Sequence, residues 1–436
     1  MHMNEISGPE KDEIIALPTR TTAATSPLRR LDYCWVVLAA GTLAIFAALG
    51  LGRFGYTVVL PAMQQGLSMD NTQAGAMASM NLAGYLALSA IGGALAARFG
   101  PRRVITAGLL LAGGAMLCTG MAESYFSAVF WRVLTGFGSG AANVAVMGMW
   151  GAWFQTKRRG LAAGIAVTGS SLALILTGFM VPRILSAGGP AGWRSCWYAY
   201  GAATLVIALV AFLLIRSRQS NGVPAGGIDG LSPRPPLSPS PALQWGLVYR
   251  SPSVWRLGLV YVAFGFSYII YMTFFVKHLV AEGGYSREAA GSLFMTMGWA
   301  SLICGFLWGW VSDQIGRRYA LVIVYLINAS AFALFALWPA PAGFTLSALL
   351  FGVTAWSIPA IMAATCGDML GPRLAPAALG FITLFFGIGQ AVAPSVAGAM
   401  ADTYGSFNPA FLLASGVALA GALGSALLKP VKTFQE

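Results

Sequence analysis

Gly309-Trp-Val-Ser-Asp313-Gln-Ile-Gly316-Arg317-Arg318 is a charged turn between two long apolar stretches, residues 287–312 and 318–338. Each stretch reaches the roughly 20 mostly apolar residues that a helix needs to cross a bilayer. The turn has an earlier counterpart, Gly93-Ala-Leu-Ala-Ala97-Arg98-Phe-Gly100-Pro101-Arg102-Arg103. The same pattern of two helices and a turn therefore occurs twice, which predicts a polytopic helical protein with an internal repeat. We call the offset from Gly93 to Gly309 the repeat offset.

The composition indicates a lipid environment. The 436 residues are 57% hydrophobic and only 9% charged, with a mean hydropathy of +0.72, whereas soluble domains have roughly 25% charged residues. The net charge of +12 comes from short basic clusters between apolar runs, which favours membrane topology over a nucleic-acid surface. The five cysteines are far apart and lack the spacing of metal ligands. We therefore expect a bilayer as partner, with no nucleic acid, metal or cofactor.

Working outward from the turn, we find twelve segments long and apolar enough to span a membrane. The longest break, residues 217–254, is rich in Pro, Gly and Ser and is typical of an extended linker. It predicts two six-helix bundles, residues 33–216 and 255–428, flanked by tails at 1–32 and 429–436. The predicted spans are 34–59, 72–97, 103–122, 125–150, 160–185, 194–216, 255–279, 287–312, 318–338, 342–367, 375–401 and 407–428.

Lysine and arginine positions predict the orientation. Most of the 26 basic residues fall in the N-tail, the linker, the C-tail and the even-numbered connections. The positive-inside rule then places both termini and the linker in the cytoplasm, with the helices in a bacterial inner membrane. Gly136 and Gly164 also recur at the repeat offset, as Gly352 and Gly380, so the two halves are expected to share one fold.

The turn at 309–318 resembles the G-x-x-x-D-x-x-G-R-R signature that the major facilitator superfamily places between helices 2 and 3 and again between helices 8 and 9. In the first copy the aspartate of the signature is replaced by Ala97. Helix 4 carries Arg132-Val-Leu-Thr-Gly136, which is similar to the R-x-x-x-G motif of the same superfamily. The resemblance covers all twelve segments and implies the major facilitator fold, a secondary transporter that exposes a midplane site to each side in turn.

The first span is similar to one branch of that superfamily. Gly50-Leu-Gly52-Arg53-Phe54-Gly55-Tyr56-Thr57 and the following Leu60-Pro61 resemble the bacterial YbfB/YjiJ-type transporters, a branch that implies no particular substrate. Monocarboxylate and oxalate/formate carriers are a more distant comparison. They usually carry a charge in the middle of helix 8, which residues 287–312 lack.

Two arginines fall inside the apolar spans. Arg53 and Arg132 share a depth of about 10 Å from the outer end of their helices, at 1.5 Å rise per residue. A charge in hydrocarbon costs from about 3 to more than 10 kcal/mol, so it normally faces a cavity. In the resembling family both helices line that cavity, and a guanidinium suits carboxylate, sulfonate or phosphate groups. We expect Arg53 to bind an anionic substrate, while Arg132 either joins it or caps backbone carbonyls.

Further polar residues occupy spans that should line the cavity. Each is a candidate substrate contact, with an interhelical hydrogen bond as the competing interpretation. Tyr56, three residues after Arg53, is expected to orient the substrate. The other candidates are Asn81, Tyr85, Asn143, Tyr268, Tyr271 and Gln390.

The charged turns are candidates for the gate. By resemblance, we expect a cytoplasmic latch around Asp313, formed with glycines and basic residues of the two turns: Gly309, Gly316, Arg317, Arg318, Arg98 and Arg102. His278, at the outer end of its span, is a candidate for proton coupling because histidine titrates near neutral pH. An interfacial role for His278 is the competing interpretation, and the sequence leaves symport, exchange and uniport open.

The function predicted is secondary transport of a small solute, with an organic anion such as a carboxylate as the favoured class. All 14 acidic residues lie in tails, turns or helix ends, so the cavity should be positive. The lack of a phosphate-binding loop argues against an ATP-driven pump, and the lack of a catalytic motif argues against an enzyme. The alternatives are a carrier of neutral or drug-like metabolites, or a receptor that binds without transport. We expect a monomer.

Overall fold

The computed structural model describes residues 27–154, 156–216 and 248–428, and every regular element in these ranges is a helix. The predicted C-tail, residues 1–26 of the predicted N-tail and most of the predicted linker lie outside the described residues, whereas residues 27–32 of the predicted N-tail belong to the first helix. The first half of the chain forms α1 (Pro27–Ile45), η1 (Phe46–Phe54), α2 (Gly55–Gly66), α3 (Asn71–Phe99), α4 (Pro101–Gly120), α5 (Tyr125–Trp153), α6 (Thr156–Gly188), η2 (Gly189–Ala191) and α7 (Gly192–Leu214).

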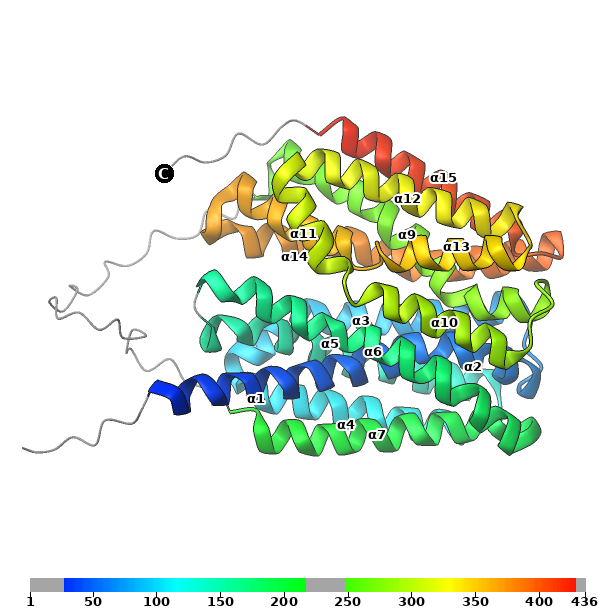
Figure 1. The fold of residues 1–436 in the computed structure, drawn as a ribbon. Helices are drawn as coiled ribbons and strands as arrows, with labels where there is room; N and C mark the ends of the chain where they lie inside the picture. The colour runs from blue at the N-terminus through cyan, green and yellow to red at the C-terminus, as the bar shows by residue number, and fades with distance from the viewer. Residues whose placement is uncertain (1–26, 155, 217–247, 429–436) are drawn as a thin grey trace, which may run out of the picture.

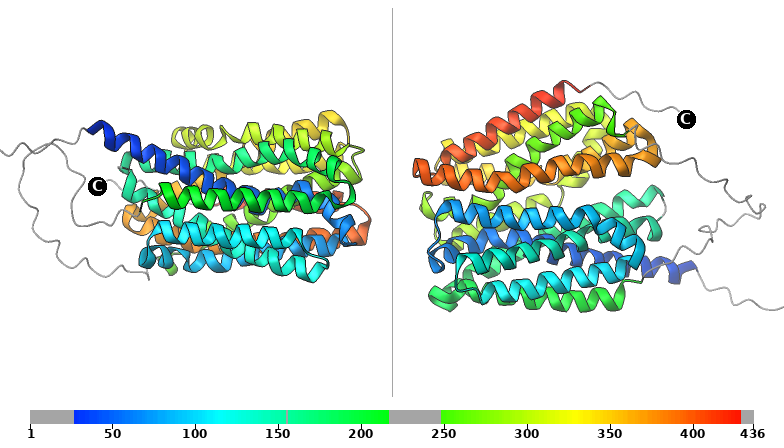
Figure 2. Two further views of the ribbon diagram at one scale, coloured as in Figure 1. Left: turned by 90° about the horizontal axis from the view of Figure 1, so that it is seen from below. Right: turned by 180° about the vertical axis from the view of Figure 1, so that it is seen from behind.

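The second half forms α9 (Pro252–Ala281), α10 (Arg287–Ser301), α11 (Cys304–Ile315), α12 (Arg317–Leu337), α13 (Pro341–Gly352), α14 (Ser357–Tyr404) and α15 (Asn408–Ala426). The two halves lie side by side as two helical bundles whose helices run roughly parallel to one axis (Figures 1 and 2). We call the end with Phe99, Leu214 and Ile315 the tail side and the end with Gly66 and Tyr404 the far side.

The repeat is visible in the backbone. Gly100 and Gly316 are related by the repeat offset, and each directly precedes a helix. Their φ angles are positive, 85° and 89°, a conformation that favours glycine. The halves meet along α3 and α14 on one side and along α6 and α10 on the other. These two contacts are equivalent under the repeat, so the predicted fold of two pseudo-symmetric six-helix bundles is confirmed.

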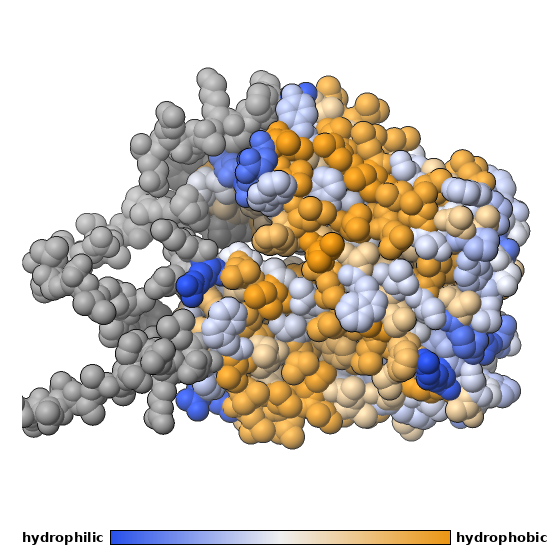
Figure 3. Space-filling model, in the orientation of Figure 1, coloured by the Kyte–Doolittle hydropathy of each residue, from blue (hydrophilic) through white to orange (hydrophobic). Residues whose placement is uncertain are grey.

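Apolar side chains cover much of the middle of the face shown in Figure 3. Within the described residues, nine helices pass a test of length and hydropathy for membrane spans, or ten if the bent pair α10 and α11 is one span. One of these stretches, Gly160–Leu214, contains both α6 and α7, and α5 is not among them although it is 29 residues long. With α7 and α5 counted separately, the described helices match the twelve predicted spans.

The first span contains a π-helical stretch. Residues Phe46–Phe54 form η1 between α1 and α2, and the N–H of Gly55 bonds to the carbonyl of Gly50. A π-helix widens the turn, and it is frequently found at functional sites. Arg53 lies in this stretch, whereas Tyr56 lies beyond it in α2.

Two spans of the second half are broken near mid-depth. Helices α10 and α11 form one span bent by 42°, with Gly298 and Ser301 before the break and Gly305 after it, residues that commonly accompany kinks. The next span along the chain is also broken, between the end of α13 and the start of α14. The two breaks touch, because the Trp356 N–H lies 3.4 Å from Cys304 Sγ and Trp308 Nε1 donates to the Val353 carbonyl at 2.8 Å.

Among the described residues, the close contacts between the two halves lie from mid-depth to the far side. A Cβ atom on Gly75 of α3 would lie 2.1 Å from the Pro394 carbonyl oxygen, and one on Gly291 of α10 would lie 2.5 Å from that of Gly178. The hydrogen bonds found between described residues of the two halves gather at these levels. On the tail side the surface is notched between the halves (Figure 3). The described structure is thus closed on the far side.

Candidate functional site

A narrow cavity lies where the two halves meet at mid-depth. Its walls come from the first span, α3, α5 and α9, which belong to both bundles. Both intramembrane arginines border it. The lining residues are Arg53, Phe54, Tyr56, Thr57, Ala78, Asn81, Leu82, Arg132, Ile269, Met272 and Thr273.

Arg53 is partly exposed and has neutral partners. Its Nη2 donates to the hydroxyl of Tyr268 in the opposite half. Its guanidinium carbon lies 5.2 Å from the ring centre of Phe54, 5.7 Å from that of Tyr85 and 5.8 Å from that of Tyr268. Its Nε is buried without a hydrogen-bond acceptor. Among the described residues, no ion pair compensates this charge.

Tyr268 joins Arg53 to α14. Its hydroxyl accepts hydrogen bonds from Arg53 and from the side-chain amide of Gln390. A tyrosine oxygen that accepts twice still has its own proton to donate. The ring of Tyr268 is stacked on Phe264, with centres 4.6 Å apart, which fixes its orientation. Arg53, which borders the cavity, and its partner Tyr268, which is not one of the lining residues, therefore have only donors left to offer.

Tyr85 and Asn143 extend this cluster within the first half. The Asn143 amide donates to the Tyr85 hydroxyl at 2.6 Å, and the Tyr85 ring faces Arg53. Four of the predicted contacts, Tyr85, Asn143, Tyr268 and Gln390, thus surround Arg53 directly or through one neighbour. They come from α3, α5, α9 and α14.

Arg132 is buried and has a different environment. Its Nη1 donates to the carbonyl of Gly52 at 2.6 Å, inside the π-helical stretch and next to Arg53. The rings of Tyr56 and Trp197 lie 5.0 and 4.9 Å from its guanidinium carbon. Only 1% of its surface is exposed. Of the two predicted roles, this geometry is the one expected for an arginine that caps a backbone carbonyl.

Tyr56 and Asn81 accompany Arg132 rather than Arg53. The Tyr56 hydroxyl donates to the Ala74 carbonyl at 2.9 Å, and the Asn81 amide donates to the Arg132 carbonyl at 2.8 Å. Both side chains line the cavity, but their polar groups bond to backbone. The roles of these residues as substrate contacts stay predictions.

Tyr271 and His278 lie inside the second half. The Tyr271 hydroxyl lies 2.7 Å from Ser347 Oγ, among phenylalanine rings. His278 Nδ1 lies 3.4 Å from Glu282 Oε2, and its ring packs on three phenylalanines. Burial raises the pKa of Glu282, but contacts from His278, Ser406 and the Phe407 amide outweigh it and hold that pKa below its usual range. Neither Tyr271 nor His278 borders the cavity.

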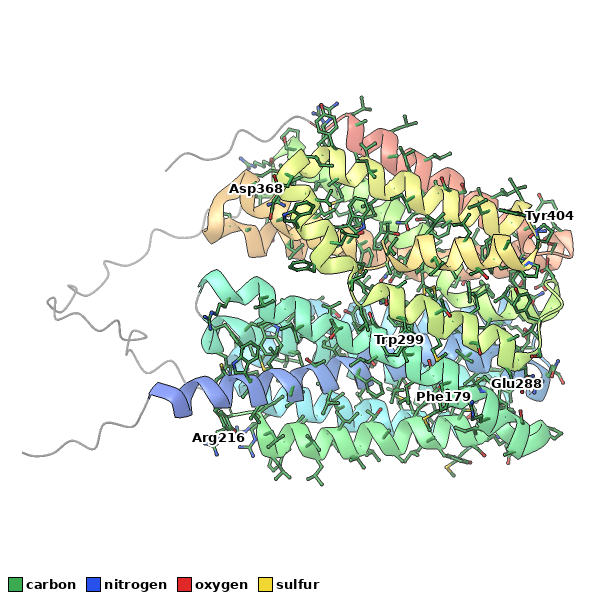
Figure 4. The ribbon with its side chains drawn as sticks, viewed as in Figure 1. Phe179, Arg216, Glu288, Trp299, Asp368 and Tyr404 are labelled. Carbon is green, nitrogen blue, oxygen red and sulfur yellow. The ribbon has the colours of Figure 1, made fainter. Side chains whose placement is uncertain are left out.

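The predicted gating residues lie on the tail side. Arg317 Nη1 is 2.5 Å from Asp313 Oδ1, and Arg317 Nε is 3.0 Å from Asp368 Oδ2; Figure 4 labels Asp368 at this end. All three belong to the second half. In the first half, Arg102 lies over the Phe212 ring at 4.2 Å and Arg98 over Phe99 at 5.3 Å. Arg318 lies near the Tyr319 ring, and Gly309 has open space beside it.

Sequence reasoning missed a mid-depth contact around Ser171. Its Oγ accepts from Trp356 Nε1 at 3.0 Å and from Ser301 at 2.7 Å, so α6 of one half contacts both breaks in the other. Phe54, next to Arg53, packs on the Trp356 ring with centres 5.3 Å apart. Trp356 thus borders the centre, whereas Trp299 is 57% exposed on the outer surface (Figure 4). Glycine and serine near the breaks are the signal that was available.

One protein family matches nearly the whole of the described fold. The family described as "Uncharacterised MFS-type transporter YbfB" matches residues 45–425, from the π-helical stretch to the end of α15. The chain belongs to this family of the major facilitator superfamily. It is therefore a multi-span membrane transporter and not an enzyme, as the charged turns and Arg132 motif predicted.

Curated relatives and solved structures agree with this assignment. The chain is 25% identical to the probable sulfoacetate transporter SauU of Cupriavidus necator, over 88% of this chain and 92% of that protein. It is 22% identical to the hexuronate transporter of Bacillus subtilis, over 86% and 89%. A bacterial homolog of the human lysosomal transporter Spinster, solved in an inward-facing and unoccupied conformation, shares the fold with a TM-score of 0.69 and 17% identity, over 92% of this chain and 96% of that one.

Proposed function

We propose that this major facilitator transporter carries a small organic anion and that Arg53 binds the anionic group. The observation that carries the proposal is the set of neutral partners around Arg53: a tyrosine hydroxyl and three aromatic rings. A guanidinium at mid-depth normally pairs with a carboxylate or with backbone carbonyls. Arg132 bonds to the Gly52 carbonyl, whereas Arg53 has neither kind of partner among the described residues and so lacks a compensating negative charge. A substrate carboxylate or sulfonate supplies that charge when it enters the cavity.

The free donors of Arg53 and of its partner Tyr268 match the acceptors of such a group. Arg53 has a buried Nε with no acceptor, and Tyr268 retains a proton because its oxygen already accepts from Arg53 and Gln390. A planar carboxylate accepts two parallel bonds from a guanidinium, which gives orientation as well as affinity. The likeness to a probable sulfoacetate transporter and to a hexuronate transporter supports an organic anion as the substrate class.

The position of Arg53 between the halves suits a transport site. Arg53 belongs to the first half and its partner Tyr268 to the second, so an anion bound there contacts both bundles at once. Rocking of the halves about this level would expose the same site to the other side. We propose that the protein lies in a bacterial inner membrane with its tail side facing the cytoplasm, because basic residues gather on that side.

Counterflow of labelled anions into proteoliposomes tests the proposal. Purified protein is first screened by thermal shift against small carboxylates, sulfonates and neutral metabolites, since a ligand of the folded state raises the melting temperature. The best ligand is then used as the labelled solute. We expect an anion to stabilise the parent protein and to accumulate, with Arg53→Lys weakening binding roughly tenfold or more through loss of the bidentate fork and Arg53→Gln abolishing it.

Arg183→Gln is the matched control. Arg183 lies near the far side on α6 and donates to the Phe179 carbonyl of its own helix, so its loss should leave counterflow unchanged. Thermal unfolding must show that each variant folds. If folded Arg53→Gln accumulates the anion as the parent does, the anion site is wrong and a neutral solute becomes the better candidate. Binding without counterflow would indicate a receptor.

A further inference from the structure

Asp402, near the far end of α14, bonds to the first turn of α3 in the opposite half. Its Oδ1 lies 3.1 Å from the Asn71 amide, and its Oδ2 lies 2.7 Å from the Thr72 amide and 2.6 Å from Thr72 Oγ1. The first amides of a helix have no partner within the helix, and the helix dipole favours a negative charge there. Asp402 therefore caps a helix that belongs to the other bundle.

Helix α3 also has a cap of its own. Asp70 accepts from the Gln73 amide at 2.6 Å, and the Gln73 side chain accepts from the Asp70 amide in return. This capping box satisfies the helix start from within the same half. The bonds to Asp402 are thus additional, and the helix keeps its local cap when the two halves separate.

The other contact between the halves, of α6 with α10, also pairs a hydroxyl with a carboxylate, but here the carboxylate is on the helix start. The repeat offset relates Thr72 to Glu288 and Ser186 to Asp402. Ser186 Oγ of α6 lies 2.9 Å from Glu288 Oε1 at the start of α10, at the far side labelled in Figure 4. Each contact therefore pairs one hydroxyl with one carboxylate, and both carboxylates come from the second half. The Ser186 hydroxyl also lies 2.8 Å from the Pro182 carbonyl, so its bond to Glu288 is shared and weaker.

Directly below these polar contacts the backbones touch. Gly75 faces the Pro394 carbonyl and Gly291 faces that of Gly178, with no room for a Cβ atom at either place. The repeat offset relates these pairs as well, Gly75 to Gly291 and Gly178 to Pro394. A solute cannot pass between helices packed this closely, so the far side can open only if both contacts separate.

We propose that Thr72 with Asp402, and Ser186 with Glu288, form a far-side clasp that holds this side closed and sets how often it opens. Asp402 and Glu288 are both exposed, so water can solvate each carboxylate when its bonds break. Exposed polar contacts of this kind are weak individually, which suits a closure that must be released in every transport cycle. The side with three bonds, at Asp402, should contribute most.

Distances between spin labels test the clasp without any substrate. One label pair, at Ala191→Cys and Tyr404→Cys, reports the far side, and another, at Arg103→Cys and Tyr319→Cys, reports the tail side; all four positions are exposed. The native cysteines are replaced and the protein is placed in lipid nanodiscs. Asp402→Ala should increase the far-open population roughly three- to tenfold, as expected for loss of charge-assisted hydrogen bonds. The tail-side distance should shorten in the same sample.

Three single variants and one double variant complete the test. Glu288→Gln should shift the far-side distance less than Asp402→Ala, and Thr72→Val should shift it in the same direction as Asp402→Ala. Glu123→Gln removes an acid from the far-side loop between α4 and α5 and should change nothing. If the double variant Asp402→Ala/Glu288→Ala gives the distance distributions of the parent, the clasp is overturned. That result would not affect the anion site, because these distances are measured without solute.

Discussion

Arg132 and Arg53 are two intramembrane arginines at similar depth with different surroundings. Arg132 is enclosed by Tyr56 and Trp197 and bonds to the Gly52 carbonyl. Where a π-helix returns to α-helical pairing, one carbonyl loses its amide partner, and an arginine donor can satisfy a carbonyl in this stretch. Because Gly52 precedes Arg53, we infer that Arg132 positions Arg53 through the backbone and does not itself bind the anion.

Substitution of Arg132 tests this positioning role. Arg132→Met keeps much of the volume and removes the bond to Gly52, so anion binding should weaken by about tenfold, the equivalent of one charge-assisted hydrogen bond. In an Arg53→Lys background the oriented fork is already lost, and Arg132→Met should add little. A double-mutant cycle of dissociation constants measures the coupling. Independent, additive losses would show instead that Arg132 contacts the anion directly.

The depth of Arg53 could be predicted from sequence because a charge stands out in an apolar run. Its partners could not, since Tyr268 and Gln390 come from helices of the other half and meet only in the folded molecule. Spacing also suggested that Arg53 and Tyr56 share a face. The π-helical stretch ends between them, which alters the angle of one relative to the other, and Tyr56 bonds to Ala74 instead.

At the scale of elements, the twelve spans followed from hydropathy, but the breaks in the second half did not. Hydropathy measures the transfer of side chains into lipid and is insensitive to a bend at the break between α10 and α11. Tertiary contacts hold the breaks in place, since Trp308 bonds to the Val353 carbonyl and Ser171 to Trp356. We infer that α11 and the start of α14 tilt at these breaks when the tail side closes.

Gly305, one residue into α11, offers a test of this tilting. A Cβ atom there would meet no atom within 4 Å, so Gly305→Ala should fit and stiffen the helix by roughly 1 kcal/mol. We expect a slightly higher melting temperature, unchanged anion affinity and a counterflow rate reduced about fivefold, if the stiffening opposes bending to a similar extent. Gly416→Ala in α15, where the added Cβ is equally free, is the control. Equal rates in the two variants would argue against a hinge.

At the scale of the whole molecule, the two halves share one fold but not one set of charges. Arg317 bonds to Asp313 and Asp368 and so ties together α11, α12 and α14 on the tail side. The repeat places Ala97, Pro101 and Ala152 at the equivalent positions of the first half. None of the three charged residues of the cluster has a charged counterpart in the first half, which indicates that the first half does not form an equivalent cluster.

This asymmetry predicts unequal responses to mirrored substitutions. Asp313→Asn should slow counterflow several-fold at unchanged anion affinity, because it weakens a partly exposed ion pair whose arginine is still held by Asp368. Ala97 is exposed, so Ala97→Asp should fold, and it should keep the parent rate because Pro101 offers no charge to pair with it. Initial rates of counterflow and thermal-shift affinities distinguish these outcomes. An unchanged rate in Asp313→Asn would remove the cluster from the transport cycle, whereas inactivation by Ala97→Asp would show that the tail side of the first half must be apolar to close.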